Sequence, residues 1–284
     1  MDFRKEFRVP EDGKLRLRDI DPAFKGRHES AEAAKEETEF YRGKLATLQT
    51  LLYAERKRAV LIVLQAMDAG GKDGTIGHVF GALNPQGARV AGFKVPTQAE
   101  LAHDFLWRVH ADVPAKGEIA IFNRSHYEDV LVTRVHGLID SPTWEARYEE
   151  IRQFERLLAG TGTTILKFFL HISKEEQLAR FAQRLDDPGR NWKISEADYK
   201  EREFWDAYMA AYEEALAKTS LPHAPWYVVP ANHKWFRNLA VSAIVGATLE
   251  ELGMRYPAPT VDLARIRREY HEAVKEEKAE HRHG

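Results

Sequence analysis

The sequence predicts an α/β fold in which a parallel sheet of five strands is covered by helices on both faces. Three observations support this prediction. Short segments rich in β-branched and aromatic residues alternate with longer segments of helical periodicity. Residues 59–66 form a continuous apolar run, which is typical of a central parallel strand. A glycine-rich loop directly follows this run and precedes a segment of helical character.

The predicted strands are short, apolar and separated by helical segments, so that each connection is expected to be a right-handed crossover. They are residues 59–66, 89–95, 118–123, 163–172 and 225–231.

The predicted helices begin at residues whose side chains can cap a helix. Ser30 precedes a segment whose leucines recur at helical spacing. Thr97, Ser173 and Ser195 are each followed three positions later by an acidic residue, which is the spacing of a capping box. The helices are expected at residues 30–57, 73–83, 97–110, 128–135, 144–159, from 173 onward, 195–217 and 234–252.

Composition excludes several classes of protein. The chain has 284 residues and a formal net charge of −2, whereas general nucleic-acid binders carry a basic excess, so no nucleic-acid partner is expected. It contains no cysteine, which excludes disulfides, thiolate metal sites and a cysteine nucleophile. The charged N-terminus is unlike a signal peptide, and the longest apolar stretch is too short to span a bilayer. We therefore expect a cytoplasmic protein with no membrane partner.

The chain is expected to contain one principal domain. Residues 1–28 are polar, contain proline and glycine, and are predicted to form an extended arm. The domain itself is predicted at residues 29–256 and includes a helical lid at about 179–202. Residues 257–284 are a charged tail, expected to be either a solvated helix or frayed chain.

Residues 68–75 have the sequence DAGGKDGT and connect a buried strand to a helix. Backbone N–H groups at a helix N-terminus bind anions, and a lysine adds positive charge. The phosphate-loop consensus G-x-x-x-x-G-K-[ST] is broken at Ala66 and Asp73, but Asp68 and Asp73 offer carboxylates to Mg²⁺ in place of a hydroxyl. The alternative is a glycine-rich turn with an incidental lysine. The strand–helix context favours phosphate binding by Ala69, Gly70, Gly71, Lys72, Asp73, Gly74 and Thr75.

A second polar cluster follows the strand at 118–123. Because ligands of open α/β sheets bind at the carboxyl ends of strands, Asn123 and Arg124 are expected to face the same crevice as Lys72. Arg124 can make bidentate contacts with phosphate, and Asn123, Glu128 and Asp129 are candidate metal ligands. The alternative is an ordinary helix N-terminus with surface charges.

Residues 179–202 are basic and contain a Pro-Gly break between two helical segments. Arg180 and Arg184 lie one helical turn apart, and Arg190 and Lys193 follow the break. This pattern resembles a mobile lid that closes over an anionic substrate, although such a charge run can also be a solvated face. Two further basic residues, Lys94 and Arg108, are candidate phosphate contacts.

Four ordered motifs together resemble the family-2 polyphosphate kinases. They are MDAGGKDG, FKVPTQAELAHDFLWRVH, FNRSHYEDVL and RLDDPGRNWK, and the resemblance extends over about residues 30–255. It implies a P-loop kinase-like fold of the thymidylate-kinase type, with three α/β/α layers. It also implies Mg²⁺, a homo-oligomer (a dimer or a tetramer) and reversible phosphoryl transfer between inorganic polyphosphate and nucleotides.

Residues are carried over from the family only where the motifs match. Asp68 and Lys72 match the motif MDAGGKDG, Arg124 is the arginine of FNRSHYEDVL, and Arg184 is the lid arginine of RLDDPGRNWK. Many members have Asp at the position of Asn123 and Asn at that of Glu128, so the family's metal assignment does not transfer directly, and Glu128 becomes a candidate for the metal-binding carboxylate in place of residue 123. The sequence is similar to the branch that phosphorylates both AMP and ADP, forming ATP, with guanine nucleotides as further candidates.

The expected mechanism places Mg²⁺ between the donor and acceptor phosphates, held by Asp68 with Glu128 or Asn123. Lys72 and Arg124 would neutralise charge on the transferred phosphoryl group, and Arg184 would close over the substrates. Two rival functions remain at this stage. One is an ATP-dependent nucleotide or small-molecule kinase on the same fold, and the other is a non-catalytic phosphate- or nucleotide-binding module.

Overall fold

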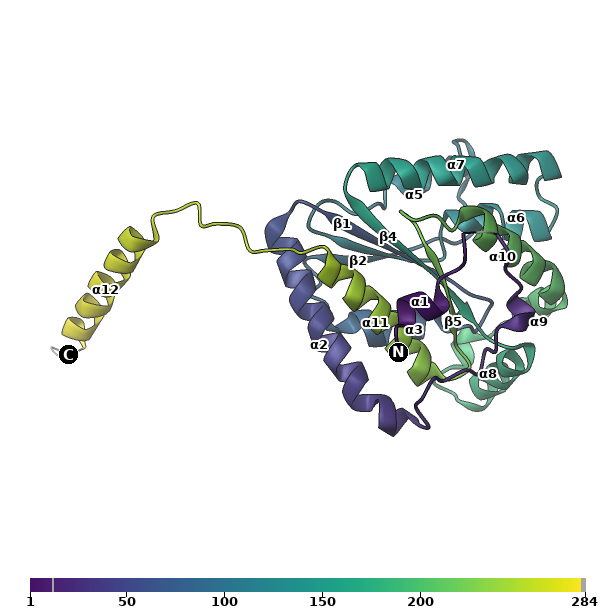
Figure 1. Ribbon diagram of the computed structural model, residues 1–284, viewed down its shortest axis with the longest axis horizontal. Helices are drawn as coiled ribbons and strands as arrows, with labels where there is room; N and C mark the ends of the chain where they lie inside the picture. The colour runs from purple at the N-terminus through teal and green to yellow at the C-terminus, as the bar shows by residue number, and fades with distance from the viewer. Residues whose placement is uncertain (12, 282–284) are drawn as a thin grey trace. The chain divides into compact units, whose positions relative to one another are not determined.

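The computed structural model describes residues 1–11 and 13–281. The chain forms two compact units, Met1–Met254 and a C-terminal unit that begins at Arg255 (Figure 1). Each unit is described separately below.

The five predicted strands are all present in the larger unit and form one parallel sheet, which confirms the predicted fold class. Their order across the sheet is β2-β3-β1-β4-β5, so β1 occupies the centre and every one of its residues is buried. Leu64 of β1 pairs with Asn123 of β3, which brings the carboxyl ends of these two strands side by side. The strands are β1 (Ala59–Gln65), β2 (Ala88–Gly92), β3 (Ile119–Asn123), β4 (Thr163–His171) and β5 (Trp226–Pro230).

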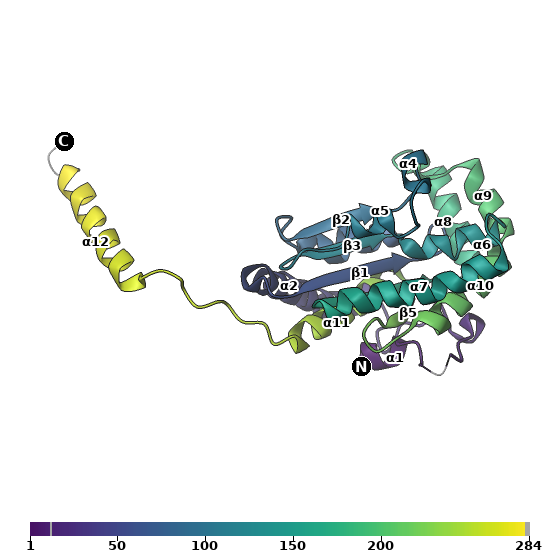
Figure 2. The same ribbon diagram turned by 90° about the horizontal axis from the view of Figure 1, so that it is seen from above.

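Helices cover both faces of the sheet (Figures 1 and 2). On one face α11 packs against α2 and α3, and on the other α10 packs against α6 and α7. Ser30 caps α2 by accepting from the Ala33 N–H, as the sequence predicts. The bounds of these helices are α2 (Ala31–Glu55), α3 (Lys72–Val79), α6 (Val132–Val135), α7 (Ser141–Gly160), α10 (Trp205–Thr219) and α11 (Lys234–Glu251).

Three predicted helices are interrupted in the structure. The segment predicted at 97–110 contains only α4 (Gln98–Leu101) and α5 (Trp107–His110). Between them the Asp104 side chain accepts from the Leu106 N–H, and this local bond competes with helical hydrogen bonding. The segment at 195–217 divides at Phe204 into α9 (Glu196–Glu203) and α10, and the segment at 128–135 begins as a 3₁₀ turn (His126–Asp129) before α6. The lid also contains α8 (Lys174–Asp186) and a 3₁₀ turn (Asn191–Lys193).

The sequence predicts an extended N-terminal arm, but part of the arm is helical. It begins with α1 (Phe3–Phe7), whose phenylalanines are one helical turn apart and both buried against Phe236 of α11. The Val9 N–H then donates to the Trp226 carbonyl at 2.9 Å, beside the edge strand β5. The arm therefore contributes apolar side chains to the core of the larger unit.

The C-terminal unit contains α12 (Leu263–Glu280), so the charged tail is helical over this range. Its described side chains are mostly exposed, and Arg265 pairs with Glu269 one turn later at 2.9 Å. None of the helices in the described part of the chain has the length and apolar character needed to cross a bilayer.

Candidate active site

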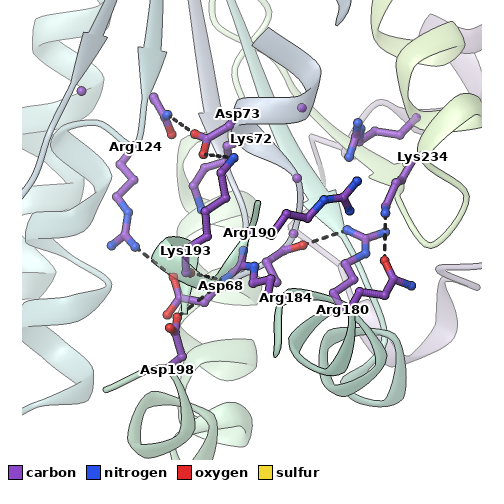
Figure 3. A pocket seen from close by; sticks show the side chains of 18 of the residues that line it. Asp68, Lys72, Asp73, Arg124, Arg180, Arg184, Arg190, Lys193, Asp198 and Lys234 are labelled. Carbon is purple, nitrogen blue, oxygen red and sulfur yellow. Dashed lines mark hydrogen bonds and ion pairs between the residues drawn. The ribbon is translucent and has the colours of Figure 1, made fainter. Parts of the chain in front are cut away.

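A cavity of about 650 Å³ lies at the carboxyl ends of β1 and β3 (Figure 3). It is bounded by the glycine-rich loop after β1, the end of β3, the lid and the start of α11. The predicted site residues that line it are Asp68, Ala69, Gly70, Gly71, Lys72, Asp73, Gly74, Lys94, Asn123, Arg124, Arg180, Arg184 and Lys193. Basic side chains predominate, so the cavity suits a polyanion despite the chain's net negative charge.

The loop after β1 has the backbone geometry of an anion-binding turn. The Gly70 N–H donates to the Met67 carbonyl at 2.9 Å, and Gly71, the N-cap of α3, has a φ of 103°. Gly70 is also required for space, because a Cβ there would lie 2.5 Å from the Ala66 Cβ. The Thr75 hydroxyl is buried and donates to the Gly71 carbonyl, so Thr75 supports the loop instead of lining the cavity.

Lys72 is the first residue of α3, and its Nζ donates to the Ala66 carbonyl at 2.9 Å. Burial, followed by the charge of Arg124, lowers the pKa of Lys72 to about 8. Asp68 acts in the opposite direction, but it does not restore the ordinary value. The lysine is therefore a partly desolvated cation beside the loop.

Arg124 connects two of the carboxylates that the sequence analysis names as candidate metal ligands. Its Nη2 donates to Asp68 Oδ1 at 2.9 Å and its Nη1 to Glu128 Oε2 at 3.3 Å. Burial opposes its charge, but Glu128 and Asp68 outweigh burial and raise the pKa of Arg124. With a φ of 63° the residue adopts a left-handed conformation that is rare outside glycine. Such a conformation persists only where the surrounding structure imposes it.

A buried polar network holds the turn that follows Arg124. Lys167 Nζ on β4 donates to Glu155 Oε2 at 2.6 Å and to the Tyr127 hydroxyl at 2.8 Å. His126 Nε2 and the Tyr127 hydroxyl both contact the other oxygen of Glu155. These four side chains are fully buried, and burial lowers the pKa of Lys167 to about 8. Because His126 and Tyr127 belong to this turn, their buried hydrogen bonds hold the turn in place.

Replacing Lys167 with methionine is expected to lower the free energy of unfolding by about 3–5 kcal/mol, because Glu155 would remain buried without its cation. The matched control is Lys218→Met, which removes a partly exposed pair with Glu214 and is expected to cost less than about 1 kcal/mol. Urea unfolding of both variants measures the difference. Equal costs would show that the buried pair has no special role.

Asp73 and Asn123, which both line the cavity, are joined by a hydrogen bond. Asn123 Nδ2 donates to Asp73 Oδ1 at 2.8 Å, and Lys193 Nζ of the lid lies 3.9 Å from Asp73 Oδ2 (Figure 3). The aspartate that replaces the consensus Ser or Thr therefore links the loop to both β3 and the lid.

The two lid arginines have different environments. Arg184 points into the cavity and donates to the Lys193 carbonyl at 2.8 Å, with Asp198 Oδ1 at 4.0 Å (Figure 3). Arg180 is only 5% exposed and donates to the carbonyls of Ala69 and Ala231 and to Glu176. Since these acceptors use its donor groups, Arg180 supports the phosphate loop more than it offers charge to a ligand.

Besides Thr75, three further candidates do not line the cavity. Arg108 is buried and donates to the Lys94 carbonyl at 2.8 Å, so it orients the segment that carries Lys94. Asp129 lies between Arg108 and Arg147, at 3.7 and 3.6 Å, and burial raises the pKa of Asp129 to about 6. Glu128 pairs with Arg124, which does line the cavity.

The donor set fits a Mg²⁺ ion whose shell is completed by substrate. Among the described residues no three or more histidine or acidic side chains form a metal-binding group. Mg²⁺ at phosphotransferase sites is commonly held by one or two carboxylates, with phosphates and water as the remaining ligands. Asp68, Asp73 and the Asn123 amide oxygen border the cavity and can supply that smaller set.

Some of the residues that line the cavity were not identified in the sequence analysis, including Lys234 and Arg237 of α11 and Gln183 of α8. Both basic residues follow the carboxyl end of β5, and Arg124 likewise follows the carboxyl end of β3. The rule that ligands bind at the carboxyl ends of strands would have identified this segment.

The pKa of Lys72 predicts the alkaline limb of the pH profile. The ammonium form carries the charge that the site needs and is lost as the pH rises through about 8. We therefore expect kcat/KM, which reports the free enzyme, to fall about tenfold per pH unit above that value. A steady-state profile between about pH 6 and 10 measures it. A flat profile throughout that range would contradict the assignment.

This fold and site define a P-loop phosphotransferase: a parallel sheet between helical layers, a phosphate loop after its central strand and a basic lid. Comparison with known proteins gives the family. A family model described as Polyphosphate kinase 2 (PPK2) matches residues 28–256, and the chain belongs to this family.

Two curated relatives and one solved structure are similar over most of their length. The chain is 56% identical over 259 residues to an AMP/ADP-polyphosphate phosphotransferase of Meiothermus ruber, covering 90% of this chain and 96% of the relative. It is 46% identical to an ADP-polyphosphate phosphotransferase of Rhodopseudomonas palustris, covering 90% and 93%. The crystal structure of Polyphosphate Kinase 2 from Arthrobacter aurescens TC1 has a TM-score of 0.92 at 42% identity, covering 96% of this chain and 97% of that one.

Proposed function

We propose that this protein transfers a phosphoryl group from inorganic polyphosphate to AMP and ADP, reversibly and with Mg²⁺. The observation that carries the proposal is that Lys72 and Arg124 line the same cavity, at the carboxyl ends of the neighbouring strands β1 and β3. The 56% identity to a relative named for both acceptors supports the choice of AMP and ADP.

The reaction needs positioning and charge neutralisation more than acid–base catalysis. The terminal phosphate oxygen of the acceptor is already anionic near neutral pH and attacks the terminal phosphorus of the chain. The bond from that phosphorus to its bridging oxygen breaks, and polyphosphate is shortened by one unit. When bound, Mg²⁺ supplies charge neutralisation at the phosphate oxygens.

Each cation has a distinct part in this proposal. Lys72 binds an oxygen of the phosphate held by the loop. Arg124, positioned by Asp68 and Glu128, stabilises negative charge on the transferred group. Arg184 and Lys193 close over the substrates, where the 3.9 Å approach of Lys193 to Asp73 already joins lid and loop.

The proposal is tested by incubating the protein with long-chain polyphosphate, Mg²⁺ and either AMP or ADP. ADP is expected from AMP, and ATP from ADP. If neither acceptor is phosphorylated by polyphosphate while ATP phosphorylates another acceptor, the protein is an ATP-dependent kinase instead. If both ligands bind without turnover, it is a non-catalytic binding module.

Several finer properties belong to the same proposal. We infer a homo-oligomer, a cytoplasmic location and activity toward guanine nucleotides from the likeness of the motifs to the family. Light scattering of the purified protein tests the oligomer, and GMP and GDP in the same assay test the guanine nucleotides.

A further inference from the structure

Arg237 lies directly against the phosphate loop although it is far from it in the sequence. It is the fourth residue of α11 and is only 2% exposed. A Cβ built on Gly71 would lie 1.9 Å from Arg237 Nη1, and one on Gly74 would lie 3.2 Å from Nη2. The absence of side chains at these two glycines therefore lets the guanidinium contact the loop backbone.

No anionic partner of the guanidinium is found among residues 1–11 and 13–281. Its Nε and Nη2 donate to Asn238 Oδ1 at 3.1 and 2.8 Å, which is a neutral acceptor. Among the described residues no carboxylate forms an ion pair with Arg237, and the charged side chains near it include two further cations, Arg180 and Lys234. Burial, reinforced by Arg180, lowers the pKa of Arg237 to about 9.

This arrangement is costly for a protein without a ligand. A buried charge is normally paired with an opposite charge, since burial removes the stabilisation that water provides. Each side-chain nitrogen of Arg180 donates to Glu176 or to a backbone carbonyl, whereas no hydrogen bond from Arg237 Nη1 is found in the described part of the structure. Arg237 also lines the cavity, so an anion in the loop can reach this group.

We propose that Arg237 binds the phosphate group held in the loop 68–74, and that this phosphate is the missing counter-ion of the buried guanidinium. The inference rests on the proposed function and deepens it, because it assigns a substrate contact to α11, the last helix of the larger unit. The ligand is a phosphate oxyanion, either of the polyphosphate chain or of a nucleotide.

The assignment separates Arg237 from the supporting role of Arg180. A residue that only stabilised the loop would lower protein stability when replaced and would leave ligand affinity unchanged. A residue whose counter-ion is the ligand behaves in the opposite way. Removing its charge leaves the stability of the ligand-free protein unchanged or raises it, and lowers the affinity for the ligand.

The test compares Arg237→Met and Arg237→Gln with wild type. Arg237→Gln keeps a polar group of smaller size should the methionine variant fold poorly. The control is Arg156→Met, the same change of charge at an exposed position of α7 outside the cavity. Melting temperature without ligand, and Kd for long-chain polyphosphate and for ADP measured separately with Mg²⁺, are determined for each.

We expect both variants to melt at or above the wild-type temperature without ligand. Their Kd should rise about tenfold to a hundredfold for the ligand whose phosphate the loop holds, because a charged hydrogen bond is lost. An effect confined to polyphosphate identifies the chain as that ligand, and one confined to ADP identifies the nucleotide. Wild-type Kd values for both ligands, or a lower melting temperature with unchanged affinity, would overturn the proposal.

The same measurements separate this inference from the proposed function. If wild-type protein binds ADP but neither binds nor consumes polyphosphate, the proposed function fails while the ADP measurement still decides the role of Arg237. If wild-type protein binds neither ligand, both are wrong.

Discussion

Replacing Lys72 with methionine is expected to lower kcat by about three to five orders of magnitude, by analogy with the loss of a transition-state cation in other phosphotransferases. The side chain borders the cavity at the start of α3 and is partly desolvated, so its charge is only weakly screened there. Methionine preserves most of the apolar stem and removes only the ammonium group and its bond to Ala66. Steady-state formation of ATP from ADP and polyphosphate measures the effect.

The control is Lys116→Met, which removes the same charge at an exposed loop position before β3. Its kcat should match wild type. Circular dichroism and the melting temperature establish that both variants are folded. A folded Lys72→Met protein that keeps more than about a tenth of wild-type kcat would rule out this lysine as a catalytic cation.

The second large effect is expected at Arg124. Arg124→Met should also reduce kcat by about three to five orders of magnitude. Arg124→Lys should recover only part of this loss, because one ammonium group cannot replace the fork that reaches both Asp68 and Glu128. The conservative change therefore tests geometry separately from charge.

Arg152→Lys is the matched control for the conservative change. Arg152 pairs with Glu149 on α7 and lies outside the cavity, so lysine should be tolerated there without loss of activity. Wild-type kcat in Arg124→Lys would show that bidentate positioning is unnecessary. Equal loss in the methionine and lysine variants would show that geometry dominates over charge.

The sequence predicts the sheet well because its signals are local. Each buried strand is a short apolar run, and the loop at 68–75 follows the central one directly. Arg124 could be placed beside Lys72 because parallel strands bring their carboxyl ends to one edge, and the pairing of Leu64 with Asn123 realises that expectation.

What could not be predicted depends on contacts between distant parts of the chain. Arg180 and Arg184 look alike in the sequence, yet the first is buried and donates to the backbone carbonyls of Ala69 and Ala231, whereas the second points into the cavity. Arg237 has no motif, and its position emerges only when α11 packs against the loop. The break at Asp104 arises from a single side-chain hydrogen bond that helical periodicity does not reveal.

The most direct test of the central claim follows the transferred phosphorus itself. Polyphosphate labelled with ³²P is incubated with unlabelled ADP and Mg²⁺, and the nucleotides are separated and degraded from the γ-phosphate inward. The account predicts label in the γ-phosphate of ATP, at one labelled group per ATP formed, and almost none with Lys72→Met. Unlabelled ATP formed together with AMP would show that ADP, not polyphosphate, is the donor and would contradict the account.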